Sequence, residues 1–259
     1  MTMQENIFQT NEPLIKRVKT GVGGLDELIE GGLPEHSITL VSGSPGAGKS
    51  IMCFQFINEG INNGEKGLYL TLDKREEGVL LQAKKLGFDF QHAIETGLAT
   101  FRYLDINKKF IYETMTNEIL SGKYKRIVLD SITPLSEMPL FFSNPQSQNA
   151  AEYSYIETGQ QTSNLTGPAQ RKHILYIMNA LESSEATAIV TSELPVASPN
   201  LSRDGISEYL ADGVILLNAD PTMDRRKLSI FKMRNTHHTL KPQDFQIAQS
   251  GIMITRKIM

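Results

Sequence analysis

The sequence of 259 residues predicts an α/β fold with a mainly parallel central sheet that helices cover on both faces. Two observations lead to this fold class. Short apolar segments alternate along the chain with segments whose apolar residues recur at helical spacing, as in parallel sheets with crossover helices. The 40% hydrophobic and 21% charged residues suit a globular chain with a sizeable core. From Gly213 onward the pattern changes to short strands, which predicts an antiparallel extension at one sheet edge.

The individual elements follow from the same patterns. Strands are expected where β-branched and aliphatic residues run between turn residues: 37–41, 68–72, 100–104, 126–130, 186–191, 213–217, 227–234, 245–248 and 252–255. Helices are expected where apolar residues recur every three or four positions and a glycine ends the run: 51–61, 75–86, 110–120 and 171–181, with a one-turn helix between the bends of 21–34.

Composition also indicates how the chain is divided into segments and in which cellular compartment it is expected. Residues 1–19 are expected to be a flexible lead, and residues 20–259 one domain. Within it, residues 143–168 are rich in Ser, Asn, Gln and Thr, which predicts a polar surface loop. The single cysteine, Cys53, allows no disulfide within the chain and suits the reducing cytoplasm. No apolar run has the length of a membrane span, so membrane insertion is not expected.

One octapeptide carries the strongest chemical signal. It matches the phosphate-binding pattern G-x-x-x-x-G-K-[ST] in full and consists of Gly43, Ser44, Pro45, Gly46, Ala47, Gly48, Lys49 and Ser50. A predicted strand precedes it and a predicted helix follows. Its glycines let backbone N–H groups converge on phosphates at the positive end of that helix. We expect Lys49 to reach the β and γ phosphates, Ser50 to bind Mg²⁺, and Ile51 to join the binding residues.

Asp130 ends an apolar strand, the position at which such enzymes place the acid that holds Mg²⁺ through water. Taken alone, an aspartate there is more typical of a turn or a helix cap. Beside a complete phosphate-binding loop, the metal role becomes the preferred interpretation. The sequence therefore predicts ATP and Mg²⁺ as ligands, with Ser50 and Asp130 on the metal.

Two further acids follow predicted strands. Hydrolysis needs a group that orients or deprotonates the attacking water, and Asp73 is the best candidate. Asp73 could equally cap the helix that begins near Lys74, and a cation at Lys74 could lower the pKa of Asp73 and weaken it as a base. Glu193 lies where a polar residue would face the γ-phosphate, because ligands gather at the carboxyl ends of parallel strands. The alternative for Glu193 is a simple loop acid.

Lys232 and Arg234 are two residues apart on a predicted strand, so their side chains project from one face. Two cations so placed could clamp a phosphate group. Exposed charges on strands are common, and spacing alone favours that plainer interpretation.

With these residues in place, the chain resembles the KaiC-like proteins of the RecA superfamily of ATPases from about residue 18 to residue 254. The segments that carry the resemblance are TGVGGLDEL at 20–28, GGLP at 31–34, the octapeptide at 43–50, VLDS at 128–131, TSE at 191–193 and KMRNTHH at 232–238. The resemblance implies a RecA-like three-layer sandwich and rings, usually hexameric, with ATP between subunits. It also implies that Lys232 and Arg234 reach the γ-phosphate of the neighbour's ATP, with Thr236 and His238 near its base or ribose. Met233, between the two cations, is counted with these binding residues.

The chain departs from that family at one critical place. The family usually has two adjacent glutamates after the second strand, and Asp73 and Lys74 stand there instead. The leading hypothesis is therefore an ATP-binding, slowly hydrolysing ring protein that regulates an unidentified protein partner. A non-hydrolysing, ATP-dependent scaffold or sensor is the first alternative, and a DNA-binding recombinase paralogue similar to RecA or RadA the second. The net acidic segments 143–168 and 193–212 disfavour nucleic acid, because phosphate binding depends on Lys and Arg.

Overall fold

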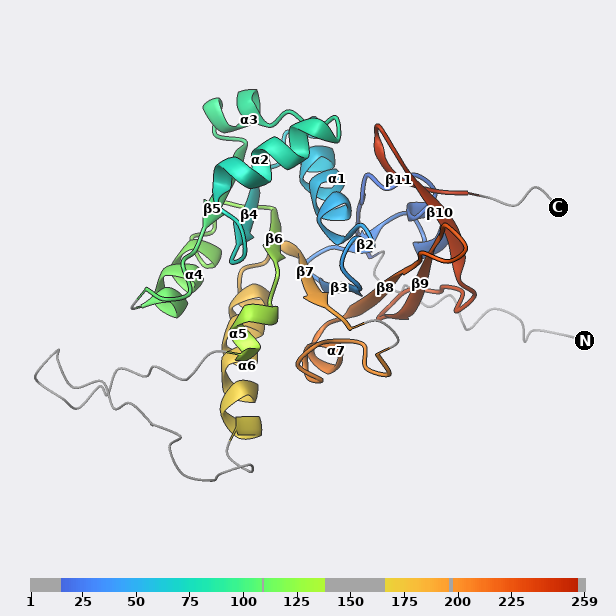
Figure 1. Ribbon diagram of the computed structural model, residues 1–259. Coiled ribbons are helices and arrows are strands. Elements are labelled where there is room, and N and C mark those ends of the chain that lie inside the picture. The colour runs from blue at the N-terminus through green and yellow to red at the C-terminus, as the bar shows by residue number, and fades with distance from the viewer. Residues whose placement is uncertain (1–14, 109, 138–165, 196–197, 256–259) are drawn as a thin grey trace, which may run out of the picture.

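The computed structural model describes residues 15–108, 110–137, 166–195 and 198–255. Within them, nine strands form one sheet in the order β11-β10-β9-β8-β3-β7-β6-β4-β5 (Figure 1). The strands are β3 (Ile38–Gly43), β4 (Gly67–Thr71), β5 (Ala99–Tyr103), β6 (Arg126–Asp130), β7 (Thr187–Glu193), β8 (Gly213–Asp220), β9 (Arg225–Met233), β10 (Gln243–Ala248) and β11 (Gly251–Ile254).

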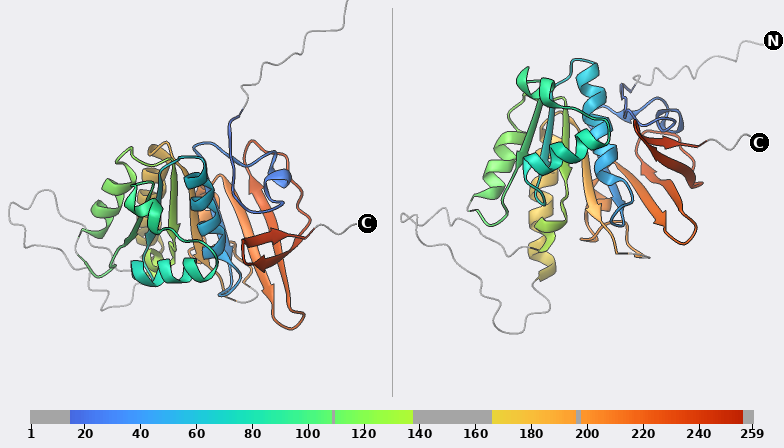
Figure 2. Two further views of the ribbon diagram at one scale, coloured as in Figure 1. Left: turned by 90° about the horizontal axis from the view of Figure 1, so that it is seen from above. Right: turned by 45° about the horizontal axis from the view of Figure 1, so that its top comes forward.

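Helices lie on both faces of this sheet (Figure 2). They are η1 (Asp26–Ile29), α1 (Lys49–Asn62), α2 (Glu76–Lys85), α3 (Gln91–Glu95), α4 (Ile111–Ile119), α5 (Thr133–Glu137), α6 (Thr166–Ser183) and α7 (Ser207–Leu210). Helices α1, α2 and α3 pack on one face, and α4 and α6 pack on the other. None of the helices in the described ranges is long and apolar enough to cross a bilayer.

The parallel part of the sheet comprises β5, β4, β6, β7, β3 and β8, so the carboxyl ends of these strands share one edge. Strands β9, β10 and β11 continue it in antiparallel fashion. The predicted fold class is thus confirmed, with one correction. Strand β8 was expected in the antiparallel extension, but it runs parallel to β3. Its unbroken apolar start, Gly213 to Leu217, is the pattern of a strand buried on both faces.

Several local expectations also need correction. Residues 17–18 form β1 (Arg17–Val18), which pairs with β2 (Leu33–Pro34), so ordered structure begins inside the predicted lead. Helix α6 begins at Thr166, so the last residues of the expected loop 143–168 are helical, and Pro168 sits in the first turn, where proline is tolerated. Residues 1–14 and 143–165 lie outside the described residues. The short helices α3, α5 and α7 were not predicted, because so few residues show no periodicity.

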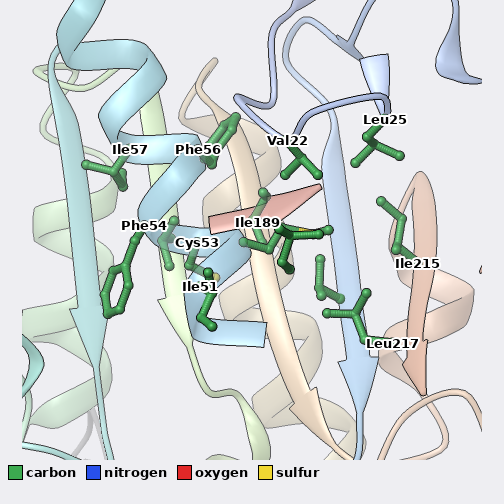
Figure 3. Close-up of a cluster of buried hydrophobic side chains, with 14 of the residues drawn as sticks. Val22, Leu25, Ile51, Cys53, Phe54, Phe56, Ile57, Ile189, Ile215 and Leu217 are labelled. Atoms are coloured by element: carbon green, nitrogen blue, oxygen red, sulfur yellow. The ribbon is translucent and has the colours of Figure 1, made fainter. Parts of the chain in front are cut away.

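The core has two layers because successive strand residues point to opposite faces. Val41, Tyr69, Val128 and Ile189 face α1, whereas their neighbours Leu40, Leu70, Leu129 and Val190 face α4 and α6. Figure 3 shows the first layer, in which Cys53, Phe54 and Ile57 of α1 pack among side chains of the strands.

Gln55 ties α1 to the two ends of the domain. Its amide nitrogen donates to the carbonyl oxygens of Gly21 (2.9 Å) and Ile252 (3.0 Å). Its amide oxygen accepts from the backbone N–H of Ile252 at 2.8 Å. Because the side chain is buried, no solvent replaces these bonds when they are lost. The helix that follows the phosphate-binding loop is therefore held against β11.

We predict that Gln55→Leu lowers the free energy of unfolding by about 3 kcal/mol, because it leaves buried carbonyl and N–H groups without partners. Urea denaturation of the nucleotide-free protein measures the change. The matched control is Gln91→Leu, which removes a surface bond to Glu95 and should alter stability by less than about 0.5 kcal/mol. Equal effects of the two substitutions would contradict the prediction.

Candidate nucleotide-binding site

The loop between β3 and α1, residues 43–48, forms the floor of the candidate site. A Cβ atom at Gly43 would lie 2.2 Å from the carbonyl oxygen of Leu217 in β8, so only glycine permits this approach. Gly48 caps α1 with a φ of 109°, a conformation that glycine adopts at little cost. Since that cap has no side chain, the amides of the first turn of α1 remain available to an anion.

Lys49 is the first residue of α1, and its side chain folds back over the loop. Its ammonium group donates to the carbonyl oxygens of Gly43 (2.9 Å) and Ser44 (3.2 Å). Burial lowers the pKa of Lys49, and the nearby carboxylates of Glu193 and Asp130 act in the opposite direction. The ammonium group of Lys49 thus lies over the loop at which we expect the phosphates of a nucleotide.

Asp130 ends β6 beside the loop and accepts three hydroxyl groups. Ser50 Oγ and Tyr69 Oη donate to its Oδ2 at 2.7 and 2.5 Å. Thr191 Oγ1 donates to its Oδ1 at 2.5 Å. The structure therefore brings together the two residues predicted to hold the metal, Ser50 and Asp130.

The chemistry of this pair fits Mg²⁺. The ion prefers hard oxygen ligands and is usually bound by one or two carboxylates together with substrate phosphates and water. A serine hydroxyl next to one carboxylate at the end of a phosphate-binding loop is such a set. Elsewhere in the described ranges, His, Cys, Asp and Glu form no group of three or more that could hold a metal ion.

Asp73 lines the same cavity and is not the N-cap of α2, the alternative that the sequence left open. Helix α2 begins at Glu76 with Arg75 at its N-cap, so Asp73 stands outside the helix. Its Oδ2 accepts from Ser131 Oγ at 3.1 Å. Burial raises the pKa of Asp73, and the Ser131 hydrogen bond partly offsets that rise.

Lys74 does not act on Asp73 as expected. Its ammonium group donates to Gln82 Oε1 at 2.9 Å, and Gln82 lies nearly two turns into α2. The pKa of Asp73 is raised, not lowered, because burial, together with the charges of Asp130 and Glu193, outweighs the hydrogen bonds from Ser131. The expectation of a base weakened by Lys74 is therefore wrong for this geometry.

These residues surround one cavity of about 540 Å³ at the carboxyl edge of the parallel strands. The predicted residues that line it are Pro45, Gly46, Gly48, Lys49, Ser50, Ile51, Asp73, Asp130 and Glu193. The other predicted loop residues, Gly43, Ser44 and Ala47, lie in the loop itself. Sequence reasoning missed the wall residues Phe54, Tyr69, Thr71, Val79 and Gln82. One signal in the sequence could have found two of them. Tyr69, Thr71 and Asp73 are spaced two residues apart, so on an extended strand their side chains point to the same face.

Lys232 and Arg234 lie away from this cavity. Lys232 in β9 pairs with Val214 in β8, which in turn pairs with Leu40 in β3. Lys232 is therefore at the level of a residue three positions before the end of β3. Its ammonium group donates to the carbonyl oxygens of Ala211 (2.6 Å) and Glu208 (3.2 Å). Arg234 pairs with Asp212 at 2.9 Å. Neither cation reaches the phosphate loop of its own chain, and their action on a neighbouring subunit stays a prediction.

The remaining predicted contacts lie near these cations. Thr236 Oγ1 accepts from Arg17 at 2.6 Å, and His238 Nδ1 lies 3.0 Å from the carbonyl oxygen of Thr236. Met233, by contrast, is buried, with its sulfur packed beside Gly213. Because that side chain belongs to the core, the expectation that it contacts a nucleotide is not supported.

Comparison with known proteins decides the family. The family model described as "ATPase: KaiC" matches residues 18–140 and 156–258. The chain belongs to the KaiC ATPase family. A crystal structure of a KaiC-like protein from Pyrococcus horikoshii OT3 superposes with a TM-score of 0.75 and 29% identity, covering 93% of this chain and 100% of that one. The predicted KaiC-like, RecA-superfamily fold is thereby confirmed.

Two curated relatives extend this KaiC-family assignment. A UPF0273 protein of Pyrococcus furiosus is 30% identical over 244 residues, which cover 93% of this chain and 94% of the relative. A UPF0273 protein of Thermotoga maritima is 30% identical over 247 residues, with coverage of 93% and 96%. Both relatives therefore match this KaiC-family chain over nearly their whole length.

Proposed function

We propose that this KaiC-family protein binds ATP with Mg²⁺, hydrolyses it slowly in a hexameric ring in the cytoplasm, and regulates a protein partner through its nucleotide state. The observation that carries the proposal is the convergence of four groups on one cavity: the phosphate loop, Lys49, the pair of Ser50 and Asp130, and the carboxylate of Asp73. Phosphoryl transfer to water requires these roles and little else, because catalysis rests on positioning and charge neutralisation.

Each group has a definite task in this proposal. The loop amides and Lys49 bind the phosphates and offset their negative charge. Ser50 and Asp130 would hold Mg²⁺, which neutralises charge as the bond to the terminal phosphate breaks. Asp73 orients the attacking water and accepts its proton, and its raised pKa makes it a stronger base than an exposed aspartate. Glu193, which also lines the cavity, assists from the γ-phosphate side.

The slow rate follows from Asp73 and Lys74 at the position of the usual glutamate pair. An aspartate reaches less far into the cavity than a glutamate, so the water must come closer to β4. The second acid of the pair is replaced by a lysine that turns toward Gln82. ATP binding depends on neither residue and should be unimpaired.

The ring supplies the remaining charge. Lys232 and Arg234 lie toward the edge of the sheet opposite the phosphate loop, so a head-to-tail contact would carry them to the neighbour's ATP. Head-to-tail contacts close into rings when the rotation permits. In that arrangement Thr236 and His238 would lie by the base or ribose.

The first alternative is an ATP-dependent scaffold or sensor without turnover. Its specific support is Lys74, whose stem lines the cavity where the family has an acid. The second alternative, a DNA-binding recombinase, gains no such support. In the segment after β7, Asp204 accepts from the N–H groups of Ile206 and Ser207 at the start of α7. That acid is therefore structural, and Arg203 is the one Lys or Arg in the described part of this segment, which remains net acidic.

We predict that mixing two inactive variants restores phosphate release. Lys49→Ala removes the phosphate contact of each subunit's own site, and Arg234→Ala removes the group given to the neighbour. Each variant alone should lose about 100-fold or more in rate. In randomly mixed rings about one site in four combines an intact loop with an intact Arg234, so activity returns to that fraction.

Lys123→Ala, at an exposed position, serves as the control in the same phosphate-release assay. Mixtures that stay as inactive as their components would reject a shared site, and a wild type that releases no phosphate at any concentration would reject hydrolysis.

We predict that the rate rises with pH through the pKa of Asp73, because only its carboxylate accepts the proton of water. That rise should lie above the usual aspartate range, since burial raises the pKa from its ordinary 3.8. Ser131→Ala removes a hydrogen bond that stabilises the charged form, so the rise should move to higher pH. The pH profile of single-turnover hydrolysis measures both.

The Ser184→Ala variant, whose lost hydroxyl bonds Leu181 far from the cavity, should leave that profile in place. An unchanged profile for Ser131→Ala, or one retained in Asp73→Asn, would show that another group titrates.

We predict that Asp73→Glu combined with Lys74→Glu raises the rate about 10-fold or more, since it restores the acid pair and its reach. Phosphate release distinguishes the two leading functions. Faster release supports a slow enzyme whose rate this pair sets. If ATP binds and drives assembly but neither wild type nor variant turns over, the scaffold or sensor is the better description.

A further inference from the structure

The carboxylate of Asp130 is held from three separate elements. Ser50 reaches it from α1, Tyr69 from β4 and Thr191 from β7. Ser50 belongs to the phosphate loop and is itself a candidate metal ligand, so its bond is the one that metal binding would compete with. Tyr69 and Thr191 have no other assigned task at the cavity.

Both residues are rigidly placed. The ring of Tyr69 is stacked between Phe54, with centroids 5.5 Å apart, and Phe101, with centroids 5.1 Å apart. Thr191 is fully buried in β7, next to β6 and β3 in the centre of the sheet. Neither hydroxyl can move far without disturbing the core, so both fix the direction in which the carboxylate points.

We infer that Tyr69 and Thr191 are positioning residues that orient Asp130 for Mg²⁺. This inference rests on the proposed Mg²⁺–ATP site. A carboxylate that is already fixed loses less freedom when it binds an ion, and partners behind a metal ligand typically contribute 10- to 100-fold to metal affinity. The two hydroxyls also donate hydrogen bonds to the carboxylate that the ion requires.

The test separates the metal from the nucleotide. Tyr69→Phe keeps the stacked ring and removes the hydroxyl, and Thr191→Val does the same for the threonine. A fluorescent ATP analogue is titrated with Mg²⁺ and again in EDTA. We expect the Mg²⁺ concentration at half-effect to rise about 10-fold in each variant, with affinity in EDTA unchanged. Thr191→Val carries the test if Tyr69→Phe does not fold.

A matched control uses a second hydrogen bond from a tyrosine hydroxyl to a carboxylate. Tyr124 Oη donates to Glu118 Oε1 at 2.5 Å in a partly buried position, on the opposite face of the sheet from α1. Tyr124→Phe should leave the Mg²⁺ dependence at the wild-type value. In an Asp130→Asn background, adding Tyr69→Phe should shift the Mg²⁺ midpoint no further, because the tyrosine acts through that carboxylate.

The outcomes distinguish this inference from the function beneath it. Wild-type Mg²⁺ dependence that survives in Tyr69→Phe and Thr191→Val would overturn the inference alone, as would an equal loss of affinity with Mg²⁺ and in EDTA. Further loss in the Asp130→Asn background would show that Tyr69 acts independently, which also overturns it. A wild type that binds no nucleotide would overturn the proposed function and this inference together.

Discussion

The candidate site depends on one carboxylate, that of Asp130, held where three elements meet. Asp130 stands half-buried at the end of β6, and a carboxylate that loses part of its hydration needs hydrogen bonds in return. Its three hydroxyl donors supply them and join α1, β4 and β7 to β6. The position of the phosphate loop relative to the sheet is thereby fixed on one side by this carboxylate and on the other by Gln55 and β11.

Burial shifts the pKa of a cation and of an acid in the cavity, each toward its neutral form. It lowers the pKa of Lys49 and raises that of Asp73, so each group is less costly to neutralise than in water. Three acids, Asp73, Asp130 and Glu193, stand beside one buried lysine. Such a balance alone would repel a triphosphate. In the proposed function, Mg²⁺ held at Ser50 and Asp130 would offset this charge, because the cation is attracted to the acids and to the phosphates alike.

The sequence predicted most of what local pattern determines. The octapeptide placed the loop between β3 and α1, and Asp130 was placed at its strand end because apolar runs end abruptly at charges. Strand alternation could have placed Tyr69 on the side of Asp73, but its bond to Asp130 depends on β4 pairing with β6, which no local pattern records. The partner of Lys74 was missed for a different reason: Gln82 lies nearly two turns into α2, and the bond depends on how the chain enters that helix. Strand β8 was misplaced because parallel pairing joins it to the distant β3.

The two outlying cations show how a shared site could stay idle in a free subunit. Lys232 is occupied by backbone carbonyls at the end of α7, and Arg234 by the carboxylate of Asp212. The same carboxylate accepts from the N–H of Ile38, the first residue of β3. Strand β3 thus has the anchor of Arg234 at one end and the phosphate loop at the other. In the proposed ring, each subunit would bind one nucleotide at its own phosphate loop and contact the neighbour's nucleotide through Lys232 and Arg234. The rigid strand β3 would then fix the distance between these two sites. The spacing between neighbouring nucleotides would then be set by the parallel sheet itself rather than by the surface loops.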